Sequence, residues 1–207
     1  MTVAVEDQAL IHAKAMSQFF TTGKLARRIV EWAELFRGEK VLEPSAGGGD
    51  LVRAMPRNVR VTAVEMDPAM AEVLRKETLH PVIEVIEADF LKLRPARDAF
   101  DVAVMNPPYE DGADGRHVAH ALRFAGRVVV LARTNFEYGT ERFSQLFRWA
   151  QVTRRAVLTR RPKFYGPADQ GQTARHDYVV LELVRREDRL LKPEPDQVET
   201  EFWTDSW

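Results

Sequence analysis

The sequence contains no cysteine among its 207 residues. This absence excludes disulfide bonds, thiolate metal sites and a cysteine nucleophile, and it suits the reducing environment of a cytoplasm. Histidine is scarce as well, and the five histidines show no metal-ligand spacing such as His-Glu-X-X-His. His117 and His120 are close enough to share a helix face, but we interpret them as a solvated or capping pair. No metal site is therefore expected.

Long apolar runs and an excess of one charge are also missing. No run approaches the roughly 20 apolar residues that a membrane-spanning helix needs, and the first ten residues lack the basic start and apolar block of a signal peptide. A cytoplasmic location is expected, in a bacterium or, for a phage protein, in the host cell. The formal net charge is −1 and 45% of the residues are hydrophobic, which is the composition of an ordinary globular domain without an evident partner.

Helical and strand-like segments alternate along most of the chain. The pattern favours one α/β domain over residues 1–186, with a parallel sheet covered by helices on both faces. The last two expected strands, 154–160 and 177–185, have no helix between them, which predicts an antiparallel edge strand. The acidic, proline-marked residues 187–207 are expected to form a mobile tail. The other expected strands cover residues 40–44, 59–66, 81–89, 100–105 and 126–132.

The glycine-rich loop after the first expected strand predicts a ligand site, because ligands of open α/β sheets bind beyond the carboxyl ends of the strands. Gly47 and Gly49 allow close approach of the backbone to a ligand. A dinucleotide-binding loop needs a third glycine at position 52, where this chain has Val52. Glu43 ends the strand, and a carboxylate there suits a cationic ligand better than a phosphate.

Acids at the ends of the next two strands extend this site. Glu65 can accept both hydroxyls of a ribose, Asp89 can accept a proton from the amine of adenine, and Phe90 can pack against the ring. An adenosine that carries a cation and no phosphate fits all of these positions. The pattern therefore favours S-adenosylmethionine as the cofactor.

The fourth strand leads into Asn106-Pro-Pro-Tyr109. With these residues, the chain resembles class I S-adenosylmethionine-dependent methyltransferases of the branch whose fourth strand ends in an NPPY-type motif. The resemblance covers about residues 16–185 and implies a Rossmann-like, mostly parallel sheet of seven strands with one antiparallel edge strand. The matching stretches are FFTTGKLA (19–26), VLEPSAGGG (41–49), VTAVEMD (61–67), EADF (87–90), MNPPY (105–109) and, more loosely, RRPKFYG (160–166).

The resemblance also implies which residues contact the cofactor. The family's first acid falls on Glu43, its ribose acid on Glu65 and its adenine contacts on Asp89 and Phe90, while the stretch around residue 20 helps to hold the methionine end. The full set of expected cofactor residues is Phe20, Thr21, Glu43, Ala46, Gly47, Gly49, Glu65, Met66, Asp89, Phe90 and Asn106.

The Asn-Pro-Pro-Tyr loop has a chemical rationale beyond that of a rigid turn. The amino nitrogen of adenine is a poor nucleophile, and two acceptors aimed at its hydrogens can free its lone pair. The side-chain oxygen of Asn106 and the carbonyl of Pro107 are the expected acceptors, because two prolines fix the backbone and bring no competing N–H group. Tyr109 offers an aromatic face to the substrate base. We therefore interpret Asn106, Pro107 and Tyr109 as catalytic residues.

The target amine is left open by the motif, since NPPY-type loops serve adenine in DNA, adenine or guanine in RNA, and glutamine in release factors. Between positions 116 and 175 there are twelve basic residues and three acids, which favours a nucleic acid. DNA is preferred because the chain looks like small bacterial and phage DNA adenine methyltransferases, with N6 methylation in short or degenerate sequence contexts. A ribosomal-RNA adenine methyltransferase is the alternative, followed by a glutamine N5 methyltransferase or an idle nucleic-acid-binding subunit. The expected substrate-binding residues are Pro108, Tyr109, Arg160, Arg161, Lys163 and Phe164.

Overall fold

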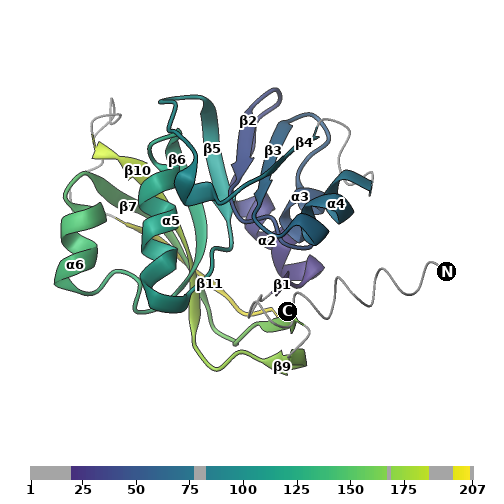
Figure 1. Ribbon diagram of the computed structural model, residues 1–207. Helices are drawn as coiled ribbons and strands as arrows, with labels where there is room; N and C mark the ends of the chain where they lie inside the picture. Colours follow the sequence, from purple (N-terminus) through teal and green to yellow (C-terminus); the bar gives the residue numbers. More distant parts are fainter. Residues whose placement is uncertain (1–19, 77–82, 167–168, 187–197, 206–207) are drawn as a thin grey trace.

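The computed structural model describes residues 20–76, 83–166, 169–186 and 198–205. A central sheet crosses the molecule, with helices packed against both of its faces (Figure 1). The sheet has eight strands in the order β11-β7-β10-β6-β5-β2-β3-β4. Their bounds are β2 Lys40–Glu43, β3 Arg60–Glu65, β4 Ile83–Glu87, β5 Phe100–Met105, β6 Ala125–Arg133, β7 Ala150–Leu158, β10 Tyr178–Arg185 and β11 Glu199–Trp203.

The expected Rossmann-like class I fold is confirmed, but two details of the sheet differ from the prediction. Strands β4, β3, β2, β5 and β6 are parallel neighbours. The antiparallel strand β10 is not at the edge, because it lies between β6 and β7 and pairs with both of them. The edge strand is an eighth strand, β11, which runs parallel to β7.

Strand β11 corrects the expectation of a mobile tail. Residues 199–203 pair with β7, and Trp203 is only 2% exposed. The ring of Trp203 meets Trp32 of helix α2 edge to face, at 6.1 Å between ring centroids. Glu201 accepts a hydrogen bond from both indole nitrogens, each at 3.1 Å. The acidic composition of the tail therefore did not indicate that residues 199–203 form a strand. The rest of the predicted tail, residues 187–197 and 206–207, lies outside the described part of the chain.

The apolar faces of the sheet are covered by different helices. One core contains Ile29 of α2 and Val52 of α3, and the other contains Val118 of α5 and Leu146 of the segment that follows α6. Strand β3 is buried at every position after its first, as expected for a strand covered on both faces. The helices are α2 Gly23–Trp32, α3 Asp50–Ala54, α4 Pro68–Lys76, α5 Ala113–Ala121 and α6 Thr140–Arg142, with short helical turns η1 Phe90–Lys92, η2 Glu110–Gly112 and η3 Phe143–Phe147.

A second, three-stranded sheet stands beside the carboxyl ends of the parallel strands. It has the order β1-β8-β9, with β1 at Phe20–Thr21, β8 at Lys163–Gly166 and β9 at Asp169–Thr173. In Figure 1 it lies at the bottom of the molecule, next to the start of α2. In the pairing of β1 with β8, Thr21 lies opposite Phe164. None of the described helices is long and apolar enough to span a membrane.

Candidate active site

The glycine loop after β2 is held by the acid that ends β3. Gly47 and Gly49 have φ of 50° and 83°, a region that glycine adopts without the steric cost of a Cβ. The Gly47 N–H donates to Glu65 Oε2 at 2.7 Å. The other oxygen, Oε1, accepts the N–H of Asp67 at 2.8 Å. Glu65 therefore organises the loop as well as facing the site, a role that the sequence did not indicate.

Two buried carboxylates make the site favourable for a cation. Glu43 is 1% exposed, and burial raises its pKa well above the ordinary value, an effect that the charge of Glu65 increases and the N–H of Ser45 opposes. Burial also raises the pKa of Glu65, against the N–H groups of Asp67 and Gly47 that lower it. Oxygen Oε2 of Glu43 is buried without a hydrogen-bond partner in the described part of the chain. A positively charged ligand group would satisfy this oxygen and relieve the repulsion.

The Asn-Pro-Pro-Tyr loop leaves β5 at the same edge of the sheet. Asn106 Nδ2 donates to Thr21 Oγ1 of β1 at 2.9 Å, which fixes the direction of the amide. The hydroxyl of Tyr109 donates to Asn106 Oδ1 and also lies 3.2 Å from the carbonyl of Leu131. The carbonyl of Asn106 accepts the hydroxyl of Ser45 at 3.3 Å, which ties this loop to the glycine loop. The catalytic candidate is thus held from two sides.

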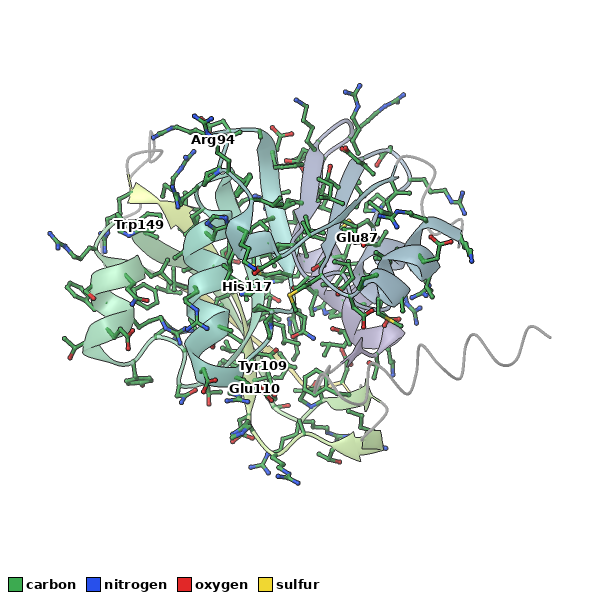
Figure 2. The ribbon with its side chains drawn as sticks, viewed as in Figure 1. Glu87, Arg94, Tyr109, Glu110, His117 and Trp149 are labelled. Carbon is green, nitrogen blue, oxygen red and sulfur yellow. The ribbon has the colours of Figure 1, made fainter. Side chains whose placement is uncertain are left out.

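Most of the predicted site residues line one pocket, which lies at the carboxyl ends of β2, β3, β4 and β5. Members that the sequence did not single out include Ser45, Asp50, Leu51, Ala88 and His117. Figure 2 shows Tyr109 and Glu110 together at the start of the segment that leads into α5, and His117 further along that helix. The predicted residues that line the pocket are Thr21, Glu43, Ala46, Gly47, Glu65, Met66, Asp89, Phe90, Asn106, Pro107, Pro108 and Tyr109.

Some predicted residues are not part of this lining. Gly49 is the N-cap residue of α3 and is buried. Phe20 begins β1, but its side chain lies outside the described part of the structure. Arg160, Arg161 and Lys163 follow β7, which runs in the same direction as β6, so they emerge at the same edge of the sheet as the pocket.

The prediction that Phe164 stacks on a substrate base has to be corrected. Phe164 is 2% exposed and belongs to the main core. Its ring packs edge to face on Tyr178 at 5.1 Å, and Tyr178 packs in the same way on Tyr109 at 5.5 Å. The pairing of β8 with β1 turns the side chain of Phe164 inward. It supports Tyr109 through Tyr178 and offers no free face to a base.

The charge asymmetry between positions 116 and 175 is partly neutralised within the fold. Arg127 pairs with Glu182 at 3.2 Å and Arg142 with Asp114 at 3.0 Å. Arg160 and Lys163 differ, because they are exposed and have no carboxylate partner among the residues that the structure covers, which is also true of Arg123, Arg148 and Arg175. Fewer basic side chains are therefore available to contact phosphates than the sequence suggested. Ion pairs also hold Arg154, Arg155 and Arg161.

The side chains of the described residues show no arrangement typical of a metal site. In the described ranges, no group of three or more histidine, aspartate or glutamate side chains is arranged to hold a metal ion. His117 and His120 instead bind backbone carbonyls, of Ala113 at 2.8 Å and Leu93 at 3.1 Å.

Comparison with known proteins identifies the family. The family model described as ribosomal RNA adenine dimethylase matches residues 9–164. The chain belongs to this family. It is 31% identical over 179 residues to an rRNA adenine N-6-methyltransferase of Saccharopolyspora erythraea, covering 84% of this chain and 46% of the relative. It is 35% identical over 138 residues to an rRNA methyltransferase of Streptomyces thermotolerans, covering 65% of this chain and 45% of the relative.

A solved structure agrees with this assignment. The 23S rRNA methyltransferase ErmE superposes with a TM-score of 0.62 at 25% identity, covering 85% of this chain and 73% of that one. The chain spans a little under half the length of the two curated relatives. S-adenosylmethionine is the cofactor expected of this family, as the sequence predicted. The partnerless oxygen of Glu43 and the adjacent acid Glu65 fit the positive charge that this cofactor carries.

The preference for DNA as the substrate was wrong. The description of the matched family names ribosomal RNA, and both curated relatives are named as rRNA methyltransferases. The resemblance to DNA adenine methyltransferases rested on the stretch FFTTGKLARRIVEWA and on the later RPKF…DY segment, because the Asn-Pro-Pro-Tyr motif does not separate DNA from RNA. That motif addresses an exocyclic amine, which is the same group whether the adenine belongs to DNA or to RNA.

Replacing Glu65 with alanine is expected to raise the dissociation constant for S-adenosylmethionine about 10- to 100-fold. The estimate assumes that one charge-assisted hydrogen bond to the ribose, worth about 1.5–3 kcal/mol, is lost. Isothermal calorimetry measures the effect. Glu87→Ala is the matched control, because Glu87 lies opposite Glu65 in the pairing of β3 with β4 but points to the surface, where it pairs with Arg75 at 3.1 Å (Figure 2). Equal affinities of both variants would place the ribose elsewhere.

Proposed function

We propose that this chain transfers a methyl group from S-adenosylmethionine to the N6 amine of an adenine in ribosomal RNA. The observation that carries the proposal is the position of Asn106. Its amide lines the same pocket as the buried acids Glu43 and Glu65, in a member of the ribosomal RNA adenine dimethylase family. A cytoplasmic location remains a prediction.

Asn106 is the acceptor that we assign to the target amine. The bond from Nδ2 to Thr21 leaves Oδ1 directed away from β1. An amide oxygen has two lone pairs, so Oδ1 can accept a hydrogen of the target amine beside or in place of the Tyr109 hydroxyl. The carbonyl of Pro107 is the second proposed acceptor. Together the two acceptors orient the nitrogen lone pair without adding a charge to the site.

The buried acids and the glycine loop are assigned to the cofactor. Glu43 binds its positively charged end, Glu65 its ribose, and Asp89 with Phe90 its adenine ring. When bound, S-adenosylmethionine supplies a methyl group that is already activated by the sulfonium. Positioning is therefore the main contribution of the protein, and no general base is needed before transfer because the product ammonium can lose its proton to water afterwards.

A parallel transfer assay tests the proposed substrate. Methyl-labelled S-adenosylmethionine is supplied with ribosomal RNA, duplex DNA, single-stranded DNA and release factor, and labelled nucleosides are separated by chromatography. Label in N6-methyl- or N6,N6-dimethyladenosine from ribosomal RNA is the expected result. Label in DNA alone, or in the protein substrate alone, would contradict the proposal.

The unpaired basic residues after β7 are expected to contact RNA phosphates. Changing both Arg160 and Lys163 to glutamine should weaken RNA binding and flatten its dependence on the logarithm of salt concentration by roughly one unit per lost contact. Binding measured by fluorescence anisotropy between low and physiological salt gives both quantities.

The opposite edge of the sheet offers a matched control. Lys40 and Arg60 begin β2 and β3, are exposed, and lie opposite each other at the amino-terminal edge. Changing both to glutamine removes the same charge from the far side of the molecule and is expected to leave the salt slope unchanged. An equal loss in both double variants would mean that only net charge matters.

A further inference from the structure

The polar side chain of His117 has no role in the assignments above. His117 lies on α5, lines the pocket with Asp89 and Phe90, and is 9% exposed. Its ring is tilted against that of Phe90 at 5.8 Å between centroids. In Figure 2 its label stands near the centre of the view, on α5.

The hydrogen bonds of His117 define its tautomer. Nδ1 lies 2.8 Å from the carbonyl of Ala113, which can only accept, so Nδ1 carries the proton. In a neutral ring, Nε2 is then an acceptor, and the described residues provide it with no hydrogen-bond partner. Burial lowers the pKa of His117, partly opposed by the Ala113 carbonyl and the Asp89 carboxylate, so the neutral form prevails at pH 7. The pocket thus contains a fixed acceptor without a donor.

Adenine supplies the missing donor. Its exocyclic amine carries two hydrogens that point in different directions. Asp89 Oδ1 accepts the N–H of Leu91 at 3.0 Å, which holds the carboxylate in place, and Oδ2 pairs with the exposed Lys92 at 3.4 Å. A carboxylate oxygen has more than one lone pair, so Asp89 can still accept one amine hydrogen beside these contacts. His117 lines the same pocket and interacts electrostatically with Asp89, and its Nε2 can accept the other hydrogen. Phe90 follows Asp89 in the sequence, and its ring lies against that of His117.

We propose that His117 is a specificity-determining residue that reads the N6 amine of the cofactor's adenine through Nε2. This inference rests on the proposed function, since it assumes that the pocket holds S-adenosylmethionine. A 6-oxo base places a carbonyl where adenine has its amine, so the lone pair of Nε2 would face another acceptor. His117 therefore favours adenine over hypoxanthine in addition to the selection by Asp89.

Calorimetry with two ligands tests the proposal without requiring turnover. S-adenosylhomocysteine and its 6-oxo analogue, S-inosylhomocysteine, are titrated into the wild-type chain and into His117→Phe, which keeps an aromatic ring against Phe90 and removes the acceptor. His117→Phe is expected to bind S-adenosylhomocysteine about 3- to 10-fold more weakly, the loss of one neutral hydrogen bond. Its preference for S-adenosylhomocysteine over the 6-oxo analogue should fall by a similar factor. His117→Gln, whose amide oxygen can accept, should recover part of both.

His120→Phe is the matched control. His120 lies one turn further along α5 and also packs against Phe90, at 4.8 Å, but its Nε2 faces the carbonyl of Leu93 and it is outside the pocket lining. Its ratio of affinities should equal that of the wild type. An unchanged ratio in His117→Phe would overturn the proposal and leave a packing role. A wild-type chain that binds neither ligand would instead overturn the proposed cofactor site itself.

Discussion

Alanine in place of Asn106 is expected to reduce the rate of methyl transfer about 10²- to 10³-fold while cofactor binding stays nearly intact. The loss corresponds to removing one oriented hydrogen-bonding group from the reacting centre. The amide is held at Nδ2 by Thr21 and contacted at Oδ1 by Tyr109, so its direction is set before any substrate arrives. Alanine removes both contacts together with the acceptor for the amine.

Single-turnover rates on ribosomal RNA, with calorimetric titration of S-adenosylhomocysteine, separate the two effects. Asn135→Ala is the matched control, because Asn135 is an exposed asparagine in the turn after β6, at the same edge of the sheet. Thermal melting of both variants detects a loss of fold. An Asn106→Ala chain that methylates at the wild-type rate would remove the amide from the mechanism.

Much of the pocket could be predicted because its residues follow strands. Glu43, Glu65 and Asn106 each come at or just after the end of a parallel strand, and all such ends meet at one edge of the sheet. The alternation of strands and helices is a local signal, and the rule for the edge is general. Together they place acids and amide in one pocket without knowledge of any contact.

The sequence gives no such signal for side chains whose position depends on distant packing. His117 enters the pocket because α5 packs with Phe90 beneath it, and that contact joins residues 27 positions apart. Phe164 is buried because β8 pairs with β1, more than 140 positions earlier. His117 was read as a surface or capping residue and Phe164 as a substrate contact. Helix faces and strand partners of this kind are fixed only by the folded chain.

The choice between DNA and RNA failed for a chemical reason. The residues that determine the reaction contact an amine, and that amine is common to both nucleic acids. The residues that would distinguish the two nucleic acids contact the sugar and the backbone. There, Arg160 and Lys163 indicate only that the partner is negatively charged, which is true of DNA and RNA alike. The match to the family described as ribosomal RNA adenine dimethylase is what favours RNA over DNA.

Alanine in place of Trp203 is expected to lower the free energy of unfolding by about 3–5 kcal/mol, the usual cost of removing a large buried aromatic side chain. Trp203 is 2% exposed, packs on Trp32 and lies under the guanidinium of Arg28 at 4.8 Å. Glu201 would also lose one of its two indole donors. Phe202→Ala is the matched control, since Phe202 is the neighbouring residue of β11 and is 67% exposed. Its effect should remain within about 0.5 kcal/mol.

The Trp203→Ala substitution is also expected to affect the active site, because helix α2 connects the two. Trp203 packs on Trp32, the last residue of α2, and the first turn of this helix is capped by Thr22, next to the Thr21 that holds Asn106. Urea denaturation measures the stability of both variants, and cofactor titration at low temperature, where Trp203→Ala stays folded, measures the site. Equal unfolding midpoints for Trp203→Ala and wild type would show that β11 lies outside the cooperative folding unit. The acidic tail would then be dispensable for the stability of the fold.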